Sequence, residues 1–436
     1  MSQFILKITT KIGFKLVSAI YIIFLAAYAL SFLGYYLEII NPSKFYSTIT
    51  KNQYYFLDFA RYYTFAKMIA LNLGHKLYFP DVQKSVFSSV IYPAKCFDYY
   101  VEYPPYNGII FYPLILFNFN LSYVLFSLLS LIFYFAVITY LKNKLSVNNE
   151  FNILYFNLGV FACLPAMYNI LLGQINFLIA GSIYLFFAAL LFNKPFRYAF
   201  VNLFIFCKPH YLFFFSLIPL IKLKFKFLAV SLAVFILLVF ISYLCTGFEN
   251  TFNYPKILYD IHAKGQYQGI VIDSEIVASH VKYIISLRSL FNIFMSKQYA
   301  VILSFITFII GTFASYVVIR KTRFEPGQNF AWSVSLVTLI FVVTCPHFFA
   351  QDLIILALPA LITMKSLDLG KILEYDIYYK TWSLIFYFYP IWSWANYLLI
   401  NGNSDWRQYI NLGVNLILLF IAFKKFQETS VVAMAG

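Results

Sequence analysis

Long apolar runs recur along this chain, and they constrain its fold more than any other feature. A helix needs about 20 apolar residues to cross a bilayer, whereas a tilted barrel strand needs only about half as many. The runs here are long and numerous enough for helices, which satisfy their own backbone hydrogen bonds in lipid. They lie near residues 16–36, 121–141, 151–171, 175–192, 227–245, 298–319, 330–345, 349–364, 381–400 and 409–423.

Composition excludes the other broad classes of protein. Of the 436 residues, 62% are hydrophobic and 11% are charged, and the mean hydropathy is +0.77. A soluble domain would have about 25% charged residues, and an aromatic content of 22% is the reverse of a disordered composition. The net charge of +15 would suggest nucleic acid on a soluble protein, but the basic residues here mostly lie in short connections between apolar runs. The sequence therefore predicts an all-α polytopic membrane protein that contacts membrane lipids and binds no nucleic acid.

The basic connections also predict the topology, because cytoplasmic loops are enriched in Lys and Arg. The first apolar run is too long for a signal-peptide core, so we expect an uncleaved span with a cytoplasmic N-terminus. Basic turns expected inside lie near residues 222–226, 320–323, 365–371 and 424–425. Segments then expected outside are 37–105, 246–297, 345–350 and 401–408. We interpret residues 1–436 as one transmembrane domain of about 10–12 spans, with 37–105 and 246–297 as its large outer loops.

Two segments allow alternative topologies. Residues 107–120 are short for a span and contain Pro113, and residues 199–221 are interrupted by Lys208-Pro209-His210. Either both segments cross the membrane fully, or the first only dips into it and the second forms a hairpin of two half-helices. The distribution of basic residues favours the second version, and both versions give the same topology beyond residue 222.

Nothing in the sequence indicates a metal or redox site. The five cysteines form no CxxC pair and no spacing with histidine that is typical of a metal site. We therefore expect no disulfide framework, no obligatory metal and no cofactor, and an assisting divalent ion stays open as the alternative.

The first outer loop contains an isolated acidic residue. Residues 54–73 lack Gly and Pro, and we expect one or two helices along the membrane surface, with aromatic side chains at headgroup level. Asp58 has apolar neighbours, and such surroundings make a carboxylate a better proton acceptor near neutral pH. Alternatively, Asp58 is a solvated loop acid paired with Arg61 at i+3. Tyr103 precedes Pro104-Pro105 and could stack on a sugar ring or headgroup, although two prolines also simply end a loop.

Two further motifs place polar groups within apolar stretches, where they are costly and tend to mark function. Gln174 and Asn176 follow Gly173, and they predict either a ligand contact or a polar contact between helices. Lys208, followed by a proline and His210, puts an ammonium where it needs a counter-anion or access to water. A lipid phosphate would meet that need, and snorkelling to the interface is the alternative.

The last motif lies between two apolar runs on the expected outer side. A helix that starts near residues 346–352 would direct its N-terminal amides towards an anion. His347 or Gln351 could hydrogen-bond a phosphate or a sugar hydroxyl. Asp352 could take part in such a site or simply cap the helix. The alternative for the whole motif is a turn without a binding role.

In this order and spacing, the motifs resemble glycosyltransferase family 87, within the GT-C superfamily, over about residues 50–360. The resemblance rests on Asp58, Tyr103-Pro104-Pro105, residues 173–176, Lys208-Pro209 and the stretch 346–359 with Asp352. The family often has a histidine just before the later aspartate. This chain has Gln351 there, with His347 four residues earlier.

The resemblance implies an enzyme of a bacterial inner membrane, with both termini cytoplasmic and the active site open to the periplasmic or outer face. Such an enzyme would transfer a hexose or pentose, often mannose, from a polyprenyl-phosphate carrier to a lipid or glycan acceptor. By analogy, Asp58 would be the general base of an inverting reaction. The residues implied to bind substrate are Arg61, Tyr103, Gln174, Asn176, Lys208, His210, His347, Gln351 and Asp352.

The main alternative is a transporter or flippase for lipid-linked sugars or another amphiphile, since it too would need broken helices and buried polar residues. A structural membrane subunit is a third interpretation. No inverted repeat is visible, and a long outer loop with an isolated acid suits an enzyme better. Transport should survive Asp58→Asn, whereas sugar transfer should not.

Overall fold

The computed structural model describes most of the chain from residue 57 onward. The described ranges are 57–92, 103–145, 153–194, 203–216, 218–222, 224–260, 284–363, 376–399 and 405–435, with isolated positions before 57 and between 261 and 283. The predicted first span, 16–36, and parts of both outer loops lie outside these ranges.

Helices dominate the described residues, which confirms the predicted all-α class of membrane protein. Four helices are long and apolar enough to cross a bilayer: α6 (Phe119–Lys144), α14 (Phe225–Phe252), α18 (Lys297–Lys321) and α22 (Asp405–Ala435), the last over Tyr409–Val431. Shorter apolar helices are α9 (Asn176–Phe192) and α19 (Gln328–Thr344). A two-stranded antiparallel pair, β1 (Gln266–Tyr267) and β2 (Ile270–Val271), lies in the segment 246–297, which is predicted to be the second outer loop.

The remaining elements are short or broken. In the first loop they are α3 (Leu57–Ala70), η1 (Gly74–Lys76) and α4 (Pro80–Ile91), followed by α5 (Tyr106–Ile110) and η2 (Tyr112–Leu116). The middle of the chain contains α7 (Ile153–Ala162), α8 (Leu164–Leu172), α11 (Leu203–Phe206), α12 (Pro209–Phe215), α13 (Ile218–Ile221), α15 (Tyr254–Tyr259) and α17 (Leu287–Phe294). Towards the C-terminus lie η5 (Ala350–Leu356), α20 (Ala357–Thr363) and α21 (Ile377–Leu399).

Two of the predicted apolar runs are not single α-helices. The run 151–171 divides into α7 and α8 at Cys163, where Pro165 in the first turn of α8 lacks an amide hydrogen for a continuous helix. The run 349–364 begins as the 3-10 helix η5 and only then becomes α20. The segments on both sides of each break are mostly apolar, so hydropathy alone could not locate these breaks.

The core of the bundle consists of helices that are apolar on all sides. Nearly every residue of α9 and α19 is buried, as expected for helices enclosed by other helices. Helix α3 is also enclosed by protein from Asp58 to Ala66. It therefore supports the interior of the fold rather than lying exposed along a surface, while α4 keeps several residues exposed.

The two segments with alternative topologies lie side by side. The Tyr106 hydroxyl donates to the Phe206 carbonyl at 2.7 Å, and the Asn107 amide donates to the Cys207 carbonyl at 3.2 Å. These bonds satisfy carbonyls that are left free where α11 ends. Neither segment forms one long helix within its described residues, and the Lys208-Pro209 interruption separates α11 from α12. This arrangement favours the version with half-helices.

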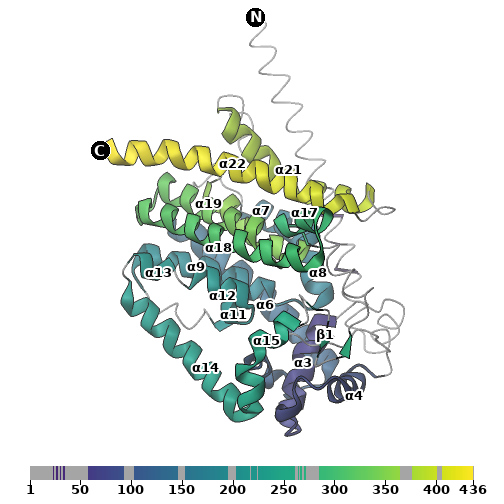
Figure 1. Ribbon diagram of the computed structural model, residues 1–436. Helices are drawn as coiled ribbons and strands as arrows, with labels where there is room; N and C mark the ends of the chain where they lie inside the picture. Colours follow the sequence, from purple (N-terminus) through teal and green to yellow (C-terminus); the bar gives the residue numbers. More distant parts are fainter. Residues whose placement is uncertain are drawn as a thin grey trace, which may run out of the picture.

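Segments predicted to lie on one side of the membrane contact one another. On the predicted inner side, the Lys222 amine donates to the Thr322 carbonyl at 2.7 Å. On the predicted outer side, the Ile285 amide donates to the Phe348 carbonyl at 2.9 Å. In Figure 1, the C-terminus and α13 lie at the left of the bundle, and α3, α4 and β1 lie at the lower right. Which side faces the cytoplasm stays a prediction.

Candidate functional site

Asp58 lies in the first turn of α3 and is buried, with 7% of its surface exposed. Its Oδ1 accepts hydrogen bonds from Arg61 Nη1 at 3.1 Å and from the Tyr103 hydroxyl at 3.0 Å. Its Oδ2 accepts from Gln174 Nε2. The pairing with Arg61 therefore exists, but inside the protein rather than in a solvated loop. Three segments of the chain converge on this one carboxylate.

Gly173 allows Gln174 to reach Asp58. It ends α8 in the left-handed conformation, with φ of 65°, and the Gln174 amide then donates to the Asn169 carbonyl at 2.8 Å. A Cβ at Gly173 would also collide with the side chain of Phe59, the neighbour of Asp58. Glycine is thus needed for the backbone conformation and for the close approach of α8 to α3.

Tyr103 is held by several contacts. Its carbonyl accepts from the Tyr78 hydroxyl at 2.7 Å, and its ring centroid lies 4.5 Å from that of Tyr62. Tyr62 in turn stacks on Phe111 at 4.6 Å. Burial and the neighbouring Asp58 raise the pKa of the Tyr103 hydroxyl well above its ordinary value, so the hydroxyl stays protonated and donates to Asp58.

Asn176, the first residue of α9, supplies amide groups without partners. Only 2% of its surface is exposed, and neither its Oδ1 nor its Nδ2 has a hydrogen-bond partner among the described residues. The Gln174 Oε1 atom is also buried without a hydrogen-bond partner among the described residues. Buried amides without partners are costly and uncommon. A ligand with hydroxyl groups would satisfy both side chains.

A second cluster surrounds Lys208. Its Nζ lies 2.7 Å from Asp352 Oδ1, and the Tyr211 hydroxyl donates to the same oxygen at 3.3 Å. The other oxygen of Asp352 accepts from the Phe349 amide at 2.9 Å and so caps η5. The counter-anion that Lys208 requires is therefore Asp352. The capping role predicted as an alternative for Asp352 is present too.

His210 and His347 lie beside this ion pair. Their ring centroids are 6.0 Å apart, and the His347 ring meets Phe349 edge-on at 4.5 Å. Gln351 is half-buried, and its carbonyl accepts from Asn169 Nδ2 at 2.7 Å. Every residue predicted to bind substrate thus belongs to one of these two clusters or directly adjoins one.

Asn169 connects the two clusters. Its carbonyl binds the Gln174 amide, and its side chain binds the Gln351 carbonyl. The Asp58 and Lys208 clusters are therefore neighbours across α8. The site holds two acid–base pairs, each of which is electrically balanced within the described residues.

Sequence reasoning missed Asn169 and a third buried cation, Arg288. Arg288 lies in α17 with 4% of its surface exposed, and its Nη1 donates to the Pro346 carbonyl at 3.1 Å. It therefore helps to hold the 346–352 turn. The available signal was an arginine isolated in the largely apolar stretch 283–294, within the predicted second outer loop. Within the part of the chain that the structure describes, no three His, Cys, Asp or Glu side chains gather as metal ligands.

Comparison with known families gives a match over the middle of the chain. The model of glycosyltransferase family 87 matches residues 100–347, which is more than half of the chain. The match includes Tyr103, Gln174 and Lys208 but neither Asp58 nor Asp352, which tertiary contacts bring to the matched residues. A search of curated proteins and a search of solved structures each return no match.

Proposed function

Because this chain belongs to glycosyltransferase family 87, we propose that it transfers a hexose or pentose, with mannose favoured, from a polyprenyl-phosphate carrier to a lipid or glycan acceptor. Family membership makes the chain a membrane glycosyltransferase. The donor, the acceptor and the mechanism below belong to the proposal.

Asp58 is the proposed general base. It takes the proton of the acceptor hydroxyl while that oxygen attacks the anomeric carbon of the sugar. The bond from this carbon to the phosphate oxygen breaks on the opposite face, and the lipid phosphate leaves with the electron pair, so the configuration is inverted. A carboxylate has about four lone-pair directions, and Arg61, Tyr103 and Gln174 occupy three. One direction is left for the acceptor hydroxyl.

Lys208 is the proposed partner of the donor phosphate. A leaving phosphate needs cationic or hydrogen-bonding groups as its charge develops. Lys208 is paired with Asp352 in a buried position, so its ammonium is held in place before the donor binds. His210 follows Lys208-Pro209 in the chain and its ring centroid lies 6.0 Å from that of His347, so both imidazoles are proposed partners of the phosphate or the sugar. The unpartnered amides of Asn176 and Gln174 are the proposed contacts of sugar hydroxyls.

We also propose a periplasmic or outer-facing site in a bacterial inner membrane, with both termini cytoplasmic. The contacts between segments predicted to share a side support the grouping of these segments, and the basic residues of the connections support the proposed direction. A lipid-linked donor would then reach the site from within the bilayer. Broken helices and buried polar residues suit a transporter as well, and family membership favours the enzyme.

The observation that supports this function best is the buried Asp58 carboxylate held by three donors from three segments. The test is an assay of the purified protein with a panel of polyprenyl-phosphate sugars and extracted lipids. We expect Asp58→Asn to lower transfer by about 10²–10⁴-fold, the usual contribution of a general base. Asp81→Asn is the matched control, because Asp81 is an exposed acid of the same loop. Inertness of folded wild-type protein towards every donor, or full activity of Asp58→Asn, would contradict the proposal.

A further inference from the structure

Two buried asparagines hold the buried ion pair of the site, one on each side. Asn107 Nδ2 donates to the Cys207 carbonyl at 3.2 Å, and Asn169 Nδ2 donates to the Gln351 carbonyl at 2.7 Å. Lys208 directly follows the first of these carbonyls, and its partner in the ion pair directly follows the second. The two asparagines, from α5 and α8, thus fix the two members of the ion pair in the same way.

The same two asparagines are also linked to the Asp58 carboxylate. The Asn169 carbonyl accepts from the Gln174 amide at 2.8 Å, and the Gln174 side chain donates to Asp58. The Asn107 backbone amide donates to the carbonyl of the residue after Tyr103 at 3.0 Å, and the Tyr103 hydroxyl donates to Asp58 at 3.0 Å. These contacts run from the carboxylate through one asparagine to the ion pair and return through the other. We call this closed series of contacts the contact ring.

Each asparagine keeps an oxygen that a ligand could use. Asn107 is 0% exposed and Asn169 is 1% exposed, and neither Oδ1 has a hydrogen-bond partner within the described part of the chain. The amide nitrogen of each faces backbone carbonyls, which only accept, so the identity of each oxygen is fixed. The Gln174 side chain is oriented likewise by Asp58, and its Oε1 is unpartnered as well. The contact ring therefore presents amide oxygens that need donors, because buried polar atoms without partners are costly and uncommon.

The proposed reaction puts the sugar inside the contact ring. An inverting transfer has the acceptor hydroxyl and its base on one face of the anomeric carbon, and the leaving phosphate on the opposite face. With Asp58 as the base and Lys208 at the phosphate, the sugar lies between the two clusters. Asn107 and Asn169 are the side chains that bridge these clusters, so they flank the sugar.

We propose that Asn107 and Asn169 are specificity-determining residues, whose Oδ1 atoms accept hydrogen bonds from hydroxyl groups of the transferred sugar. This inference rests on the proposed function and narrows its sugar. A neutral sugar with free hydroxyls donates to the amide oxygens of the contact ring. A uronic acid brings a carboxylate, which only accepts and adds an unpaired charge to a buried site. The site therefore takes a neutral hexose or pentose and rejects an acidic one.

Deoxygenated donors test the two asparagines. Wild-type protein should use polyprenyl-phosphate mannose with a kcat/KM about tenfold above that of the mono-deoxy analogue that lacks a contacted hydroxyl. Asn107→Leu should bring this ratio close to one for one deoxy position, and Asn169→Leu should do so for another. Damage to the fold alone would lower the use of both donors and leave their ratio unchanged. That result would overturn the proposal.

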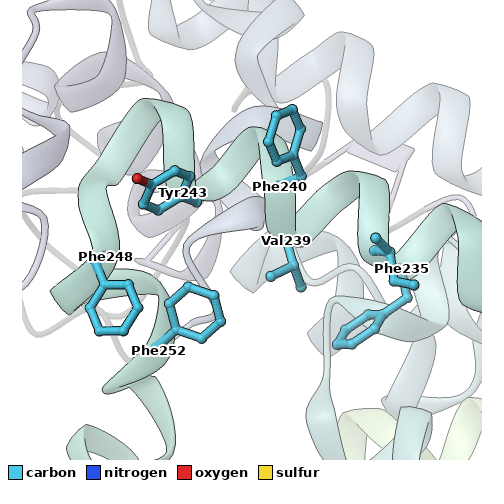
Figure 2. Close-up of a pocket in the computed structure, with 7 residues that line it drawn as sticks. Phe235, Val239, Phe240, Tyr243, Phe248 and Phe252 are labelled. Atoms are coloured by element: carbon cyan, nitrogen blue, oxygen red, sulfur yellow. The ribbon is translucent and has the colours of Figure 1, made fainter.

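Asn250→Leu is the matched control. Asn250 is also buried, and its Nδ2 donates to the Gly74 carbonyl at 3.0 Å, but it lies on α14 outside the contact ring. It comes between Phe248 and Phe252, which lie side by side in Figure 2. This variant loses a bond of the same kind, so we expect a lower melting temperature and wild-type ratios between donors. A ratio that falls as it does in Asn107→Leu would contradict the assignment.

Binding is measured apart from turnover. In detergent, polyprenyl-phosphate mannose should raise the melting temperature of wild-type protein more than polyprenyl-phosphate glucuronate does, and Asn107→Leu should reduce the difference. Equal stabilisation by the two lipids, or equal transfer of the two sugars, would overturn the proposal.

The outcomes also separate this inference from the proposed function. If the neutral sugar is preferred in binding but never transferred, the proposed function fails and the sugar site stands. If sugar is transferred without preference between neutral and acidic donors, the function stands and the site fails. If mannose is neither bound nor transferred by folded protein, both fail.

Discussion

At the residue scale, the two buried carboxylates of the site differ in where their cations come from. Asp58 pairs with Arg61 three positions away on the same helix, at an N–O distance of 3.1 Å. Asp352 pairs with Lys208, which is 144 positions away, at 2.7 Å. The first pair follows from helical spacing. The second exists only because two broken helices meet. Each carboxylate also accepts further hydrogen bonds, so neither charge is left unsatisfied in the interior.

The Lys208–Asp352 pair allows a test that separates stability from activity. Lys208→Met should destabilise the protein by about 3–5 kcal/mol, because it leaves the buried Asp352 without its cation. The double variant Lys208→Met with Asp352→Asn should recover most of that loss, because it removes the unpaired charge and keeps an oxygen that accepts from the Phe349 amide. Thermal unfolding in detergent measures both effects.

Sugar transfer is measured on the same variants. We expect the double variant to be stable but inactive, because it lacks the cation proposed for the leaving phosphate. Transfer at the wild-type rate by the stable double variant would show that Lys208 serves only the fold.

At the scale of elements, the site is built where regular structure is interrupted. Gly173 ends α8 at Asp58, the Lys208-Pro209 break divides α11 from α12, and η5 starts at the cap formed by Asp352. These interruptions place polar groups at a depth where continuous helices would present only apolar side chains. Gly and Pro in the sequence predict where the helices are interrupted. They do not predict which interruptions contact one another, because each break has many possible neighbours.

Gly173→Ala tests this role of an interruption. The left-handed conformation costs a residue with a side chain about 1–2 kcal/mol, and the new Cβ would also collide with Phe59. We expect a lower melting temperature and reduced transfer, because Gln174 would move away from Asp58. Gly413→Ala in α22 is the control. A Cβ there meets no atom within 4 Å, so this variant should keep or slightly raise stability, as alanine does within helices. Equal effects of the two variants would contradict the role assigned to Gly173.

At the scale of the whole molecule, the bundle has two ends that the charge pattern distinguishes. The predicted inner turns contact each other through Lys222 and Thr322, and the predicted outer segments do so through Ile285 and Phe348. The consistency of these contacts supports one topology for the described part of the chain. Under the proposed topology, the Asp58 and Lys208 clusters would lie towards the outer side.

Labelling of single cysteines tests this topology. In a background without native cysteines, we introduce Asp81→Cys in the first loop and Lys321→Cys at the end of α18, both at exposed positions. A membrane-impermeant maleimide should label position 81 from outside intact cells and position 321 only after the membrane is opened. Labelling of both from the same side would rule out the proposed arrangement.

The sequence by itself determined the features that depend on neighbouring residues. Apolar runs of sufficient length specify membrane helices, the i+3 spacing pairs Asp58 with Arg61, and Gly and Pro mark the interruptions, because each effect acts within one or two turns of helix. The breaks at Cys163 and within 349–364 were missed, since hydropathy does not report backbone geometry. Only the tertiary structure decided that Gln174 binds Asp58 across 116 positions, that Asp352 neutralises Lys208, and that Arg288 holds the turn at Pro346. Such pairs depend on how whole helices pack, and no local pattern of residues specifies which of many buried polar groups will meet.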